Sequence, residues 1–483
     1  MLDEKLKQLQ SDWLDEATIS EMNEKMSNGE LTAEELTLMY IDNISLRGKN
    51  VNAVLELNQQ AVHIAKALDV ERREKGSRSL LHGIPILLKD NMGTNDLMHT
   101  SCGSLALKDF YATEDAFIVK KLREAGAVIL GKTNMTEWAN FMSDRMTNGW
   151  SSRGGQVNNP YGLFDVGGSS SGAGAGIAAN MAAVAIGTET TGSILNPSAQ
   201  NSLVGIKPTV GAISRAGVIP LTTTQDTPGP MARTVRDATI TFSLLIGTDP
   251  ADPVTAEASR LAGVDWMSLL DKGSLAGVRL GVAREIFERE ASTERLALFD
   301  RALKELEAAG AVIVDDLNLG AMENDLGYNV LLYEFKAALN AYLGKTAASN
   351  SIRTLADVIQ FNNEHPKETL KFGQIMLEKV ERTSGTLTER AYIEALLRNR
   401  HLAGDIALGK AFDAYNIQAL VFPQDHGCSF GAAAGYPSVT VPAAYSEEGE
   451  PFGITFSGKA FTEPELIGYA YAFEQKVNAR RKP

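Results

Sequence analysis

The chain has 483 residues, of which 46 are basic and 60 are acidic, so its formal net charge is −14. Hydrophobic residues make up 44% and charged residues 22%, which is typical of a folded globular protein and excludes an intrinsically disordered one. A surface that binds nucleic acid or an anionic membrane needs clustered positive charge. We therefore expect neither nucleic acid nor a membrane as a partner.

Cysteine usage and the N-terminus indicate the compartment. Cys102 and Cys428 are too few for a disulfide framework or a cysteine-rich metal site. The first ten residues, MLDEKLKQLQ, lack the apolar core of a secretory signal. No apolar stretch of the length that spans a bilayer occurs without heavy glycine content. We expect a reduced, soluble, cytoplasmic protein that is a monomer or a homodimer.

Residues 1–75 are predicted to be helical. Thr32 and Glu35 fit a capping box, in which the hydroxyl and the carboxylate bond opposite free N–H groups at a helix start. A second helix contains Ala61 to Leu68 and ends in the charged run 71–75, which is typical of a solvated helix end.

From residue 80 the pattern changes to strand, helix and strand. The apolar runs 86–88 and 127–130 predict buried strands. Asp115 can cap a helix that runs through Ala125 and ends at Gly126. This order favours a sheet with crossover helices.

The middle of the chain is rich in glycine and poor in charge. Residues 149–217 hold 14 of the 43 glycines, and Glu189 and Lys207 are the two charged residues between Val166 and Ser214. Such a segment is expected to be buried, and its small residues permit close backbone packing. Residues 172–185 predict a helix of glycine and alanine pressed against a sheet. This segment is where we expect the chemistry.

Charged residues return after about residue 250. Helices are predicted at 294–309, 328–345, 388–412 and 463–478, and strands at 278–282, 312–314, 419–422, 438–441 and 453–456. We expect one domain over 1–483, with an N-terminal helical part (1–75), a catalytic core (76–250), a mostly helical insertion (251–415), and a return to the sheet with a C-terminal helix (416–483).

One candidate motif is the nucleophile elbow of the α/β-hydrolases. Residues 168–172, GSSSG, match its G-x-S-x-G pattern. The elbow needs a buried strand directly before it, whereas residues 160–165, PYGLFD, begin with a strand breaker. It also needs a downstream histidine, for which His365, His401 and His426 are available. This interpretation is disfavoured but stays open.

Three segments form a second constellation. Lys89 directly follows the apolar run 86–88, residues 167–172 read GGSSSG, and residues 187–194 read GTETTGSI. Taken singly, Lys89 fits a lysine that extends toward solvent, and each serine cluster fits a turn. Taken together with the charge-poor segment between Val166 and Ser214, the three segments indicate one shared function.

With these three segments the chain resembles the amidase signature family, the Ser–cisSer–Lys amidohydrolases. The resemblance runs from about residue 30 to the end and is densest at 82–90 and 150–237. Bacterial peptide amidases share further segments, which are here Trp138–Phe141, Gly149–Ser151, Arg153–Gln156 and Gln225–Met231. The family implies an α/β fold with a single large mixed, mostly parallel sheet flanked by helices on both faces.

The resemblance also implies residue roles. Ser193 would be the nucleophile, Ser169 would relay the proton from a position after a cis peptide bond, and Lys89 would be the base. The oxyanion hole would consist of the backbone N–H groups of Thr190, Thr191, Gly192 and Ser193. Residues placed near the substrate would be Trp138, Ala139, Asn140, Phe141 and Asp226. The alternative for Trp138 and Phe141 is that they belong to an aromatic core.

The chemistry of these parts is consistent with that reading. A serine hydroxyl needs a base that takes its proton during attack. Lysine serves as that base only when neutral, and burial lowers its pKa. No metal or organic cofactor enters this scheme.

Three positions depart from the wider family pattern. Glu189 stands in place of the more common Asp, and Leu195 in place of Arg, as in the peptide-amidase branch. Thr191 stands where the family usually has Gly and the near branch Asp. A β-branched residue restricts the backbone, so Thr191 puts the substrate preference in question.

The expected function is hydrolysis of a carboxamide C–N bond to carboxylate and ammonia through an acyl-enzyme. The expected substrate is a small-molecule or peptide amide, in particular a peptide or amino-acid amide with a terminal carboxamide. One alternative is an aryl or aliphatic amidase of broad specificity. Another is the amidase-like subunit of a tRNA-dependent amidotransferase, against which Leu195 and the acidic net charge argue.

Overall fold

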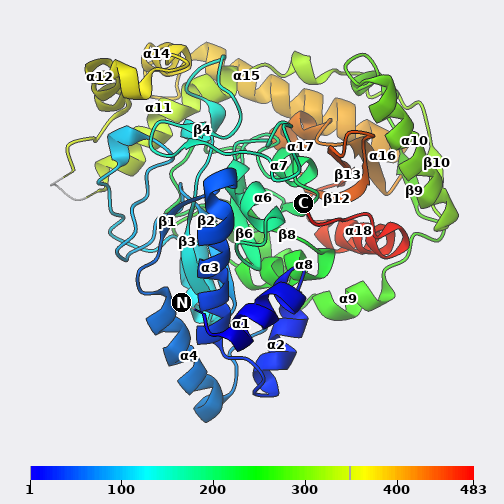
Figure 1. The fold of residues 1–483 in the computed structure, drawn as a ribbon. Coiled ribbons are helices and arrows are strands. Elements are labelled where there is room, and N and C mark those ends of the chain that lie inside the picture. Colours follow the sequence, from blue (N-terminus) through cyan, green and yellow to red (C-terminus); the bar gives the residue numbers. More distant parts are fainter. Residues whose placement is uncertain (1, 347–349) are drawn as a thin grey trace.

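The structure is a computed structural model that describes residues 2–346 and 350–483. The strands are β1 (Val54–Leu57), β2 (Pro85–Lys89), β3 (Val128–Thr133), β4 (Trp150–Ser151), β5 (Gly155–Gln156), β6 (Val184–Glu189), β7 (Val204–Lys207), β8 (Thr227–Ala232), β9 (Arg279–Gly281), β10 (Val312–Val314), β11 (Ala419–Pro423), β12 (Ser438–Tyr445) and β13 (Pro451–Ser457). In the described residues, eleven of them form one sheet in the order β1-β3-β2-β6-β8-β7-β12-β13-β11-β9-β10, and β4 pairs with β5 (Figure 1).

Helices surround this sheet. They are α1 (Glu4–Leu9), α2 (Ile19–Ser27), α3 (Ala33–Val51), α4 (Ala61–Lys75), α5 (Phe117–Glu124), α6 (Ser171–Ala178), α7 (Leu195–Gln200), α8 (Val235–Leu245), α9 (Trp266–Lys272), α10 (Thr293–Ala308), α11 (Asn329–Gly344), α12 (Leu355–Glu364), α13 (Pro366–Thr369), α14 (Ile375–Glu381), α15 (Arg390–Arg400), α16 (Lys410–Ala414), α17 (Cys428–Ala434) and α18 (Glu463–Val477). Among the described residues, no helix has the length and apolar character that a bilayer span requires.

The expected large mixed sheet flanked by helices is confirmed. Parallel pairing occurs in two blocks, β3-β2-β6 and β11-β9-β10. The strands between these blocks pair antiparallel, and so does β1 at the edge. Parallel neighbours need a crossover, which α5 and α6 provide, whereas β12 and β13 are joined by a short loop. Helices α6 and α7 pack on each other and on the sheet, and α8 and α18 form a second contacting pair that also packs on it.

The predicted strands and most predicted helices are present, including the capping box of Thr32 and Glu35 at the start of α3. The helix predicted at 172–185 is wrong in its second half, because α6 ends at Ala178 and β6 begins at Val184. Every residue from 171 to 189 is buried, so hydrophobic periodicity cannot separate helix from strand there.

Two further local expectations differ from the structure. Asp115 does not cap α5, whose N-cap is Ala116. Its carboxylate instead accepts a hydrogen bond from the backbone N–H of Asn95 and pairs with Arg123. The strands that were not expected from the sequence are β1, β4, β5, β6, β7 and β8, of which β1 interrupts the segment 1–75 that was expected to be helical. Strand β8 reads TPGPMA, and proline and glycine normally disfavour a strand interior.

Segment 251–415 contributes to two cores. Strands β9 and β10 join the main sheet. Helices α11, α12, α14 and α15 lie together at one end of the molecule (top of Figure 1). Their apolar residues, among them Phe335 and Leu339, form a second cluster with Trp138, Phe141 and Leu221 of the preceding segment. This second cluster places α11 directly over the end of the sheet that carries the polar residues described below.

Close packing of α6 depends on Gly172. A Cβ atom at this position would overlap the backbone carbonyl oxygens of Asn134 and Ala53. A Cβ atom at Gly176, one turn further on, would lie at an ordinary 3.4 Å from its nearest neighbour, the Cβ of Ala53. A side chain is therefore excluded at Gly172 and accommodated at Gly176, although both residues lie in α6.

We expect Gly172→Ala to destabilise the protein by about 2 kcal/mol or more, because rigid backbone atoms must move. The matched variant Gly176→Ala is expected to be neutral or to stabilise by up to about 1 kcal/mol, because alanine favours the helix. Urea unfolding followed by circular dichroism measures both. Equal effects of the two substitutions would contradict this account of the packing.

Candidate active site

Lys89 is the last residue of β2, which lies between β3 and β6 inside the parallel block. Its side chain is fully buried. The Nζ atom donates hydrogen bonds to Oγ of Ser169 at 2.8 Å and to the carbonyl oxygen of Thr188 at 3.2 Å. Burial lowers the pKa of Lys89 to about 7, against the opposing effect of the carboxylates of Asp226 and Glu189. A neutral amine is therefore accessible near neutral pH.

Of three consecutive serines, Ser169 is the one whose hydroxyl contacts the lysine. Ser170 Oγ donates to the Thr188 carbonyl at 3.1 Å, and Ser171 Oγ donates to the Gly167 carbonyl at 2.5 Å. The peptide bond from Gly168 to Ser169 is cis, as the resemblance implied. The structure thus separates one serine whose hydroxyl contacts the amine of Lys89 from two whose hydroxyls bond the backbone.

Ser193 lies in the loop between β6 and α7, with 7% of its surface exposed. Its carbonyl oxygen accepts a hydrogen bond from the N–H of Ser170 at 3.3 Å, which joins the two serine segments. In the part of the chain that the structure describes, no hydrogen bond links Oγ of Ser193 to Oγ of Ser169. The structure therefore brings Lys89 and Ser169 into direct contact and places Ser193 beside them through the backbone.

The loop that carries Ser193 is held by Glu189, a residue whose part in the site the sequence did not reveal. Its Oε2 atom accepts hydrogen bonds from the N–H groups of Ile194 at 2.7 Å and Leu195 at 3.0 Å. Burial raises the pKa of the Glu189 carboxyl, while Lys207 and these N–H groups act to lower it. One carboxyl side chain therefore anchors two backbone donors that directly follow Ser193.

The expected oxyanion donors have different surroundings. The Gly192 N–H faces the carboxyl of Glu189, and Gly192 has a φ of +73°. Within residues 2–346 and 350–483, the N–H groups of Thr190, Thr191 and Ser193 have no hydrogen-bond acceptor. These three are therefore the ones that remain available to an incoming oxygen atom.

The residues expected near the substrate fall into two groups. Trp138 and Ala139 line a pocket next to the site, and Trp138 also belongs to the second apolar cluster. Phe141 is buried in that cluster, and the amide of Asn140 contacts Asn148 at 3.5 Å. Trp138 therefore belongs both to the pocket wall and to the aromatic core.

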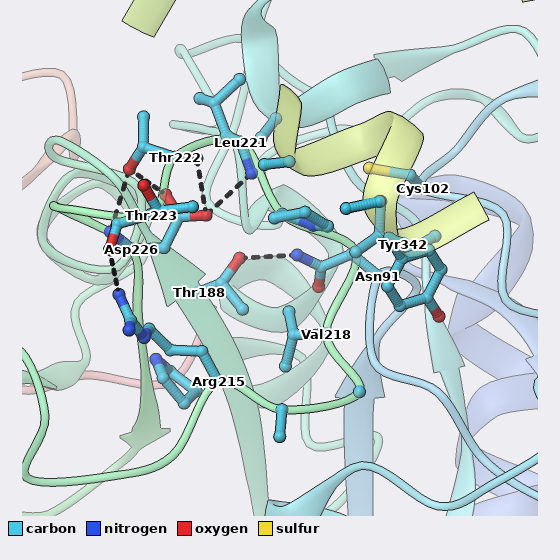
Figure 2. Close-up of a pocket in the computed structure, with 18 of the residues that line it drawn as sticks. Asn91, Cys102, Thr188, Arg215, Val218, Leu221, Thr222, Thr223, Asp226 and Tyr342 are labelled. Carbon is cyan, nitrogen blue, oxygen red and sulfur yellow. Dashed lines mark hydrogen bonds between the residues drawn. The ribbon is translucent and has the colours of Figure 1, made fainter. Parts of the chain in front are cut away.

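Asp226 also lines this pocket, but its oxygens bond the protein itself. Oδ2 accepts from the N–H groups of Leu221 at 2.7 Å and Thr222 at 2.9 Å (Figure 2). Oδ1 accepts from Oγ1 of Thr190 at 2.5 Å. Burial raises the pKa of Asp226, against these donors. The carboxyl therefore ties the pocket loop 221–226 to the loop that carries Ser193.

The pocket has a volume of about 560 Å³ and reaches the polar site at Thr188 and Thr190. Its aromatic lining residues are Phe110, Trp138, Phe335 and Tyr342. Arg215, a charged residue of the wall, pairs with Asp252 at 2.6 Å and donates to the Thr223 carbonyl at 2.6 Å. The remaining wall is therefore mainly apolar and suits a substrate with an apolar group.

Glu334 connects the helical segment to this pocket and was missed by the sequence analysis. It is fully buried on α11. Its Oε2 atom accepts from the N–H groups of Thr223 at 2.8 Å and Thr224 at 3.1 Å, and Oε1 accepts from the hydroxyl of Tyr392 at 2.8 Å. No sequence pattern predicts a pairing between residues more than a hundred positions apart.

The structure does not support the nucleophile-elbow alternative. The residues directly before Ser169 form no strand, because the segment from 157 to 168 is loop. His365 bonds the Phe361 carbonyl, His401 pairs with Asp405, and His426 packs against Phe287. Among the described residues, no histidine is hydrogen-bonded to a serine of either cluster.

A metal site needs several ligating side chains close together. In the part of the chain that the structure describes, no group of three His, Cys, Asp or Glu side chains is arranged to hold a metal ion.

Comparison with known proteins agrees with this geometry. Residues 35–426 match the family described as Amidase. A probable amidase of Arabidopsis thaliana is 39% identical over 482 residues, which cover 97% of this chain and 92% of the relative. The solved structure of the native peptide amidase from Stenotrophomonas maltophilia is 43% identical with a TM-score of 0.90, over 97% of this chain and 98% of that one. An amidase family protein from Bacillus anthracis is 38% identical with a TM-score of 0.94, over 100% of this chain and 95% of that one.

The Glu334 contacts generate a stability prediction. Glu334→Gln keeps the size of the side chain but replaces one acceptor oxygen by a donor group, so we expect a loss of about 2 kcal/mol in unfolding free energy. Tyr392→Phe removes one donor to the same carboxylate and is expected to cost about 1 kcal/mol. Urea unfolding of both variants tests whether Glu334→Gln loses more unfolding free energy than Tyr392→Phe. A Glu334→Gln variant as stable as the parent would show that the carboxylate does not hold loop 221–226.

Proposed function

This chain belongs to the amidase family and is an amide-hydrolysing enzyme, and on that premise we propose that Lys89, Ser169 and Ser193 cleave a terminal carboxamide through an acyl-enzyme. The observation that carries the proposal is the 2.8 Å hydrogen bond from Nζ of Lys89 to Oγ of Ser169. It joins a buried amine, whose pKa is lowered to about 7, to a hydroxyl next to the loop of Ser193. This is the pairing of base and alcohol that serine activation requires.

The proposed reaction has two halves. In the first, Ser193 Oγ attacks the amide carbonyl carbon while its proton passes to Ser169 and the Ser169 proton passes to Lys89. The oxyanion accepts hydrogen bonds from the free N–H groups of the 190–193 loop. The proton then returns through Ser169 to the leaving nitrogen, and ammonia departs. In the second half, water attacks the acyl-enzyme with the same groups as base and relay, which frees the carboxylate.

Two observations support a peptide or amino-acid amide as the substrate. The pocket of about 560 Å³ offers an aromatic wall for the acyl group. The chain is also similar over nearly its whole length to a protein named a peptide amidase. A broad aryl or aliphatic amidase would use the same chemistry, so a panel of amides of each class decides between these substrates.

We expect Lys89→Ala and Ser193→Ala to lower kcat by about 10⁴-fold or more, because each removes a part of the nucleophile relay. Ammonia release from the amide panel by the purified chain is the measurement, and it also separates an independent amidase from a subunit that needs a partner. His426→Ala is the control and should keep activity. Loss of activity in His426→Ala, with Lys89→Ala still active, would contradict the proposed roles.

The pKa of Lys89 generates a prediction about pH. Below a pKa of about 7 the amine is protonated and cannot accept a proton, so kcat/KM should fall tenfold per pH unit on the acidic side and level off above it. Rates on a peptide amide between mild acid and mild alkali, with folding checked by circular dichroism, test this. An activity maximum well below neutral pH would exclude Lys89 as the base. Chelators are expected to leave the rate unchanged.

A further inference from the structure

Asn196 contacts both of the segments that carry the two serines of the proposed relay. It is the second residue of α7 and follows Ser193 in the same loop-to-helix segment. Its backbone N–H donates a hydrogen bond to the carbonyl oxygen of Gly192 at 2.7 Å, and its Oδ1 atom accepts one from the N–H of Gly168 at 2.9 Å. Gly168 directly precedes Ser169. One residue therefore joins the loop of Ser193 to the segment of Ser169.

Asp425 determines how the amide of Asn196 is oriented. It lies in the turn between β11 and α17, and its Oδ1 atom accepts a hydrogen bond from Nδ2 of Asn196 at 3.0 Å. An ionised carboxylate can only accept hydrogen bonds, and the N–H of Gly168 can only donate one. The amide therefore satisfies both neighbours in a single orientation, with its nitrogen toward Asp425 and its oxygen toward Gly168.

The two segments are packed closely at this amide. A Cβ atom at Gly167 would lie 2.6 Å from Cα of Pro197 and 2.9 Å from Oδ1 of Asn196, so a side chain has no room there. A further hydrogen bond between the segments, from the N–H of Ser170 to the carbonyl of Ser193, is longer at 3.3 Å. Since N–H···O bonds are commonest near about 2.9 Å, the bond that Asn196 accepts is the better formed of the two restraints.

The proposed relay needs a fixed separation between its two serine hydroxyls. A proton passes between two groups when their heavy atoms are within hydrogen-bond reach, about 2.6–3.2 Å. Oγ of Ser169 is held by Lys89, whereas Oγ of Ser193 makes no hydrogen bond to it in the described residues. Contacts between the two segments therefore have to hold Ser193 beside Ser169, and the amide of Asn196 supplies one of them.

We propose that Asn196, oriented by Asp425, is a positioning residue that holds the loop of Ser193 at the distance from Ser169 that proton transfer requires. This inference rests on the proposed function of the site and deepens it. Neither Asn196 nor Asp425 is among the described residues that line the pocket. Their effect therefore falls on kcat and not on KM.

The variant Asn196→Asp tests the orientation of the amide. Its carboxylate can still accept from the N–H of Gly168, but it sets a second acceptor against Asp425, where the unmodified enzyme has a 3.0 Å hydrogen bond. We expect kcat for ammonia release from a peptide amide to fall about tenfold or more, because small misplacements of reacting groups are costly. KM is expected to stay within about twofold, because substrate binding is unchanged.

The matched control for this variant is Asn158→Asp. It adds the same charge at an exposed asparagine, whose Nδ2 atom donates to the carbonyl of Asn50. It should keep the kcat of the unmodified enzyme. An unchanged kcat in Asn196→Asp, or an equal fall in Asn158→Asp, would overturn the proposal.

Exchange of the two side chains gives a sharper test. In the double variant Asn196→Asp with Asp425→Asn, the amide at position 425 can donate to the carboxylate at position 196, so the contact is restored with its polarity reversed. We expect kcat to return to within about threefold of the unmodified enzyme, because the two positions act as a coupled pair. A side chain that only fills space would give no such rescue. A double variant no faster than Asn196→Asp would overturn the proposal.

Asn196→Ala serves if circular dichroism shows that Asn196→Asp does not fold. It removes both side-chain hydrogen bonds of Asn196 without adding a charge. The same fall in kcat at nearly constant KM is expected. An unchanged kcat in Asn196→Ala would overturn the proposal.

Ser193→Ala, assayed in parallel, separates this inference from the proposed function. Ammonia release that survives Ser193→Ala would mean that the proposed function fails together with this inference. If Ser193→Ala abolishes the release and Asn196→Asp leaves kcat unchanged, the proposed function stands and the inference about Asn196 fails.

Discussion

The site depends on the burial of one lysine. A lysine in water is protonated at neutral pH, and removal from water is what lowers its pKa. Lys89 reaches this state because β2 lies between two parallel neighbours and ends beneath the small residues of α6. The same small residues bring Ser169 within 2.8 Å of the amine. Close backbone packing and the lowered pKa of Lys89 are therefore consequences of one feature, a core segment almost free of charge and large side chains.

Around this lysine, buried carboxyl groups position loops. Glu189 binds the N–H groups that follow Ser193, Asp226 binds loop 221–226 and the hydroxyl of Thr190, and Glu334 binds the same loop from α11. Each carboxyl loses hydration on burial and recovers part of that cost through several donors. Together these bonds form a continuous path from the helical segment to the loop that carries Ser193. The pocket wall and this loop are consequently parts of one hydrogen-bonded unit.

Thr188 holds two neighbouring side chains of the site through two different atoms. Thr188 binds the lysine through its carbonyl oxygen and Asn91 through its hydroxyl. The first contact holds the buried amine of Lys89, and the second holds the side chain of Asn91 beside it.

The sequence by itself determined the family and the order of most strands and helices, and it predicted the set of Lys89, Ser169 and Ser193 that the proposed function uses. These follow from short segments whose residue types are specific to the chemistry and whose apolar runs are local. It did not determine where α6 ends, because a wholly buried segment has no polar face, nor that the proline-containing segment 227–232 is a strand. It placed Asp226 near the substrate without showing that its oxygens are used within the protein. Only the tertiary structure showed that Glu334 holds the pocket loop and that Oδ1 of Asn91 has no hydrogen-bond partner in the described residues. Hydrogen bonds between distant segments depend on how the chain folds back on itself. They therefore produce no periodic pattern in the sequence.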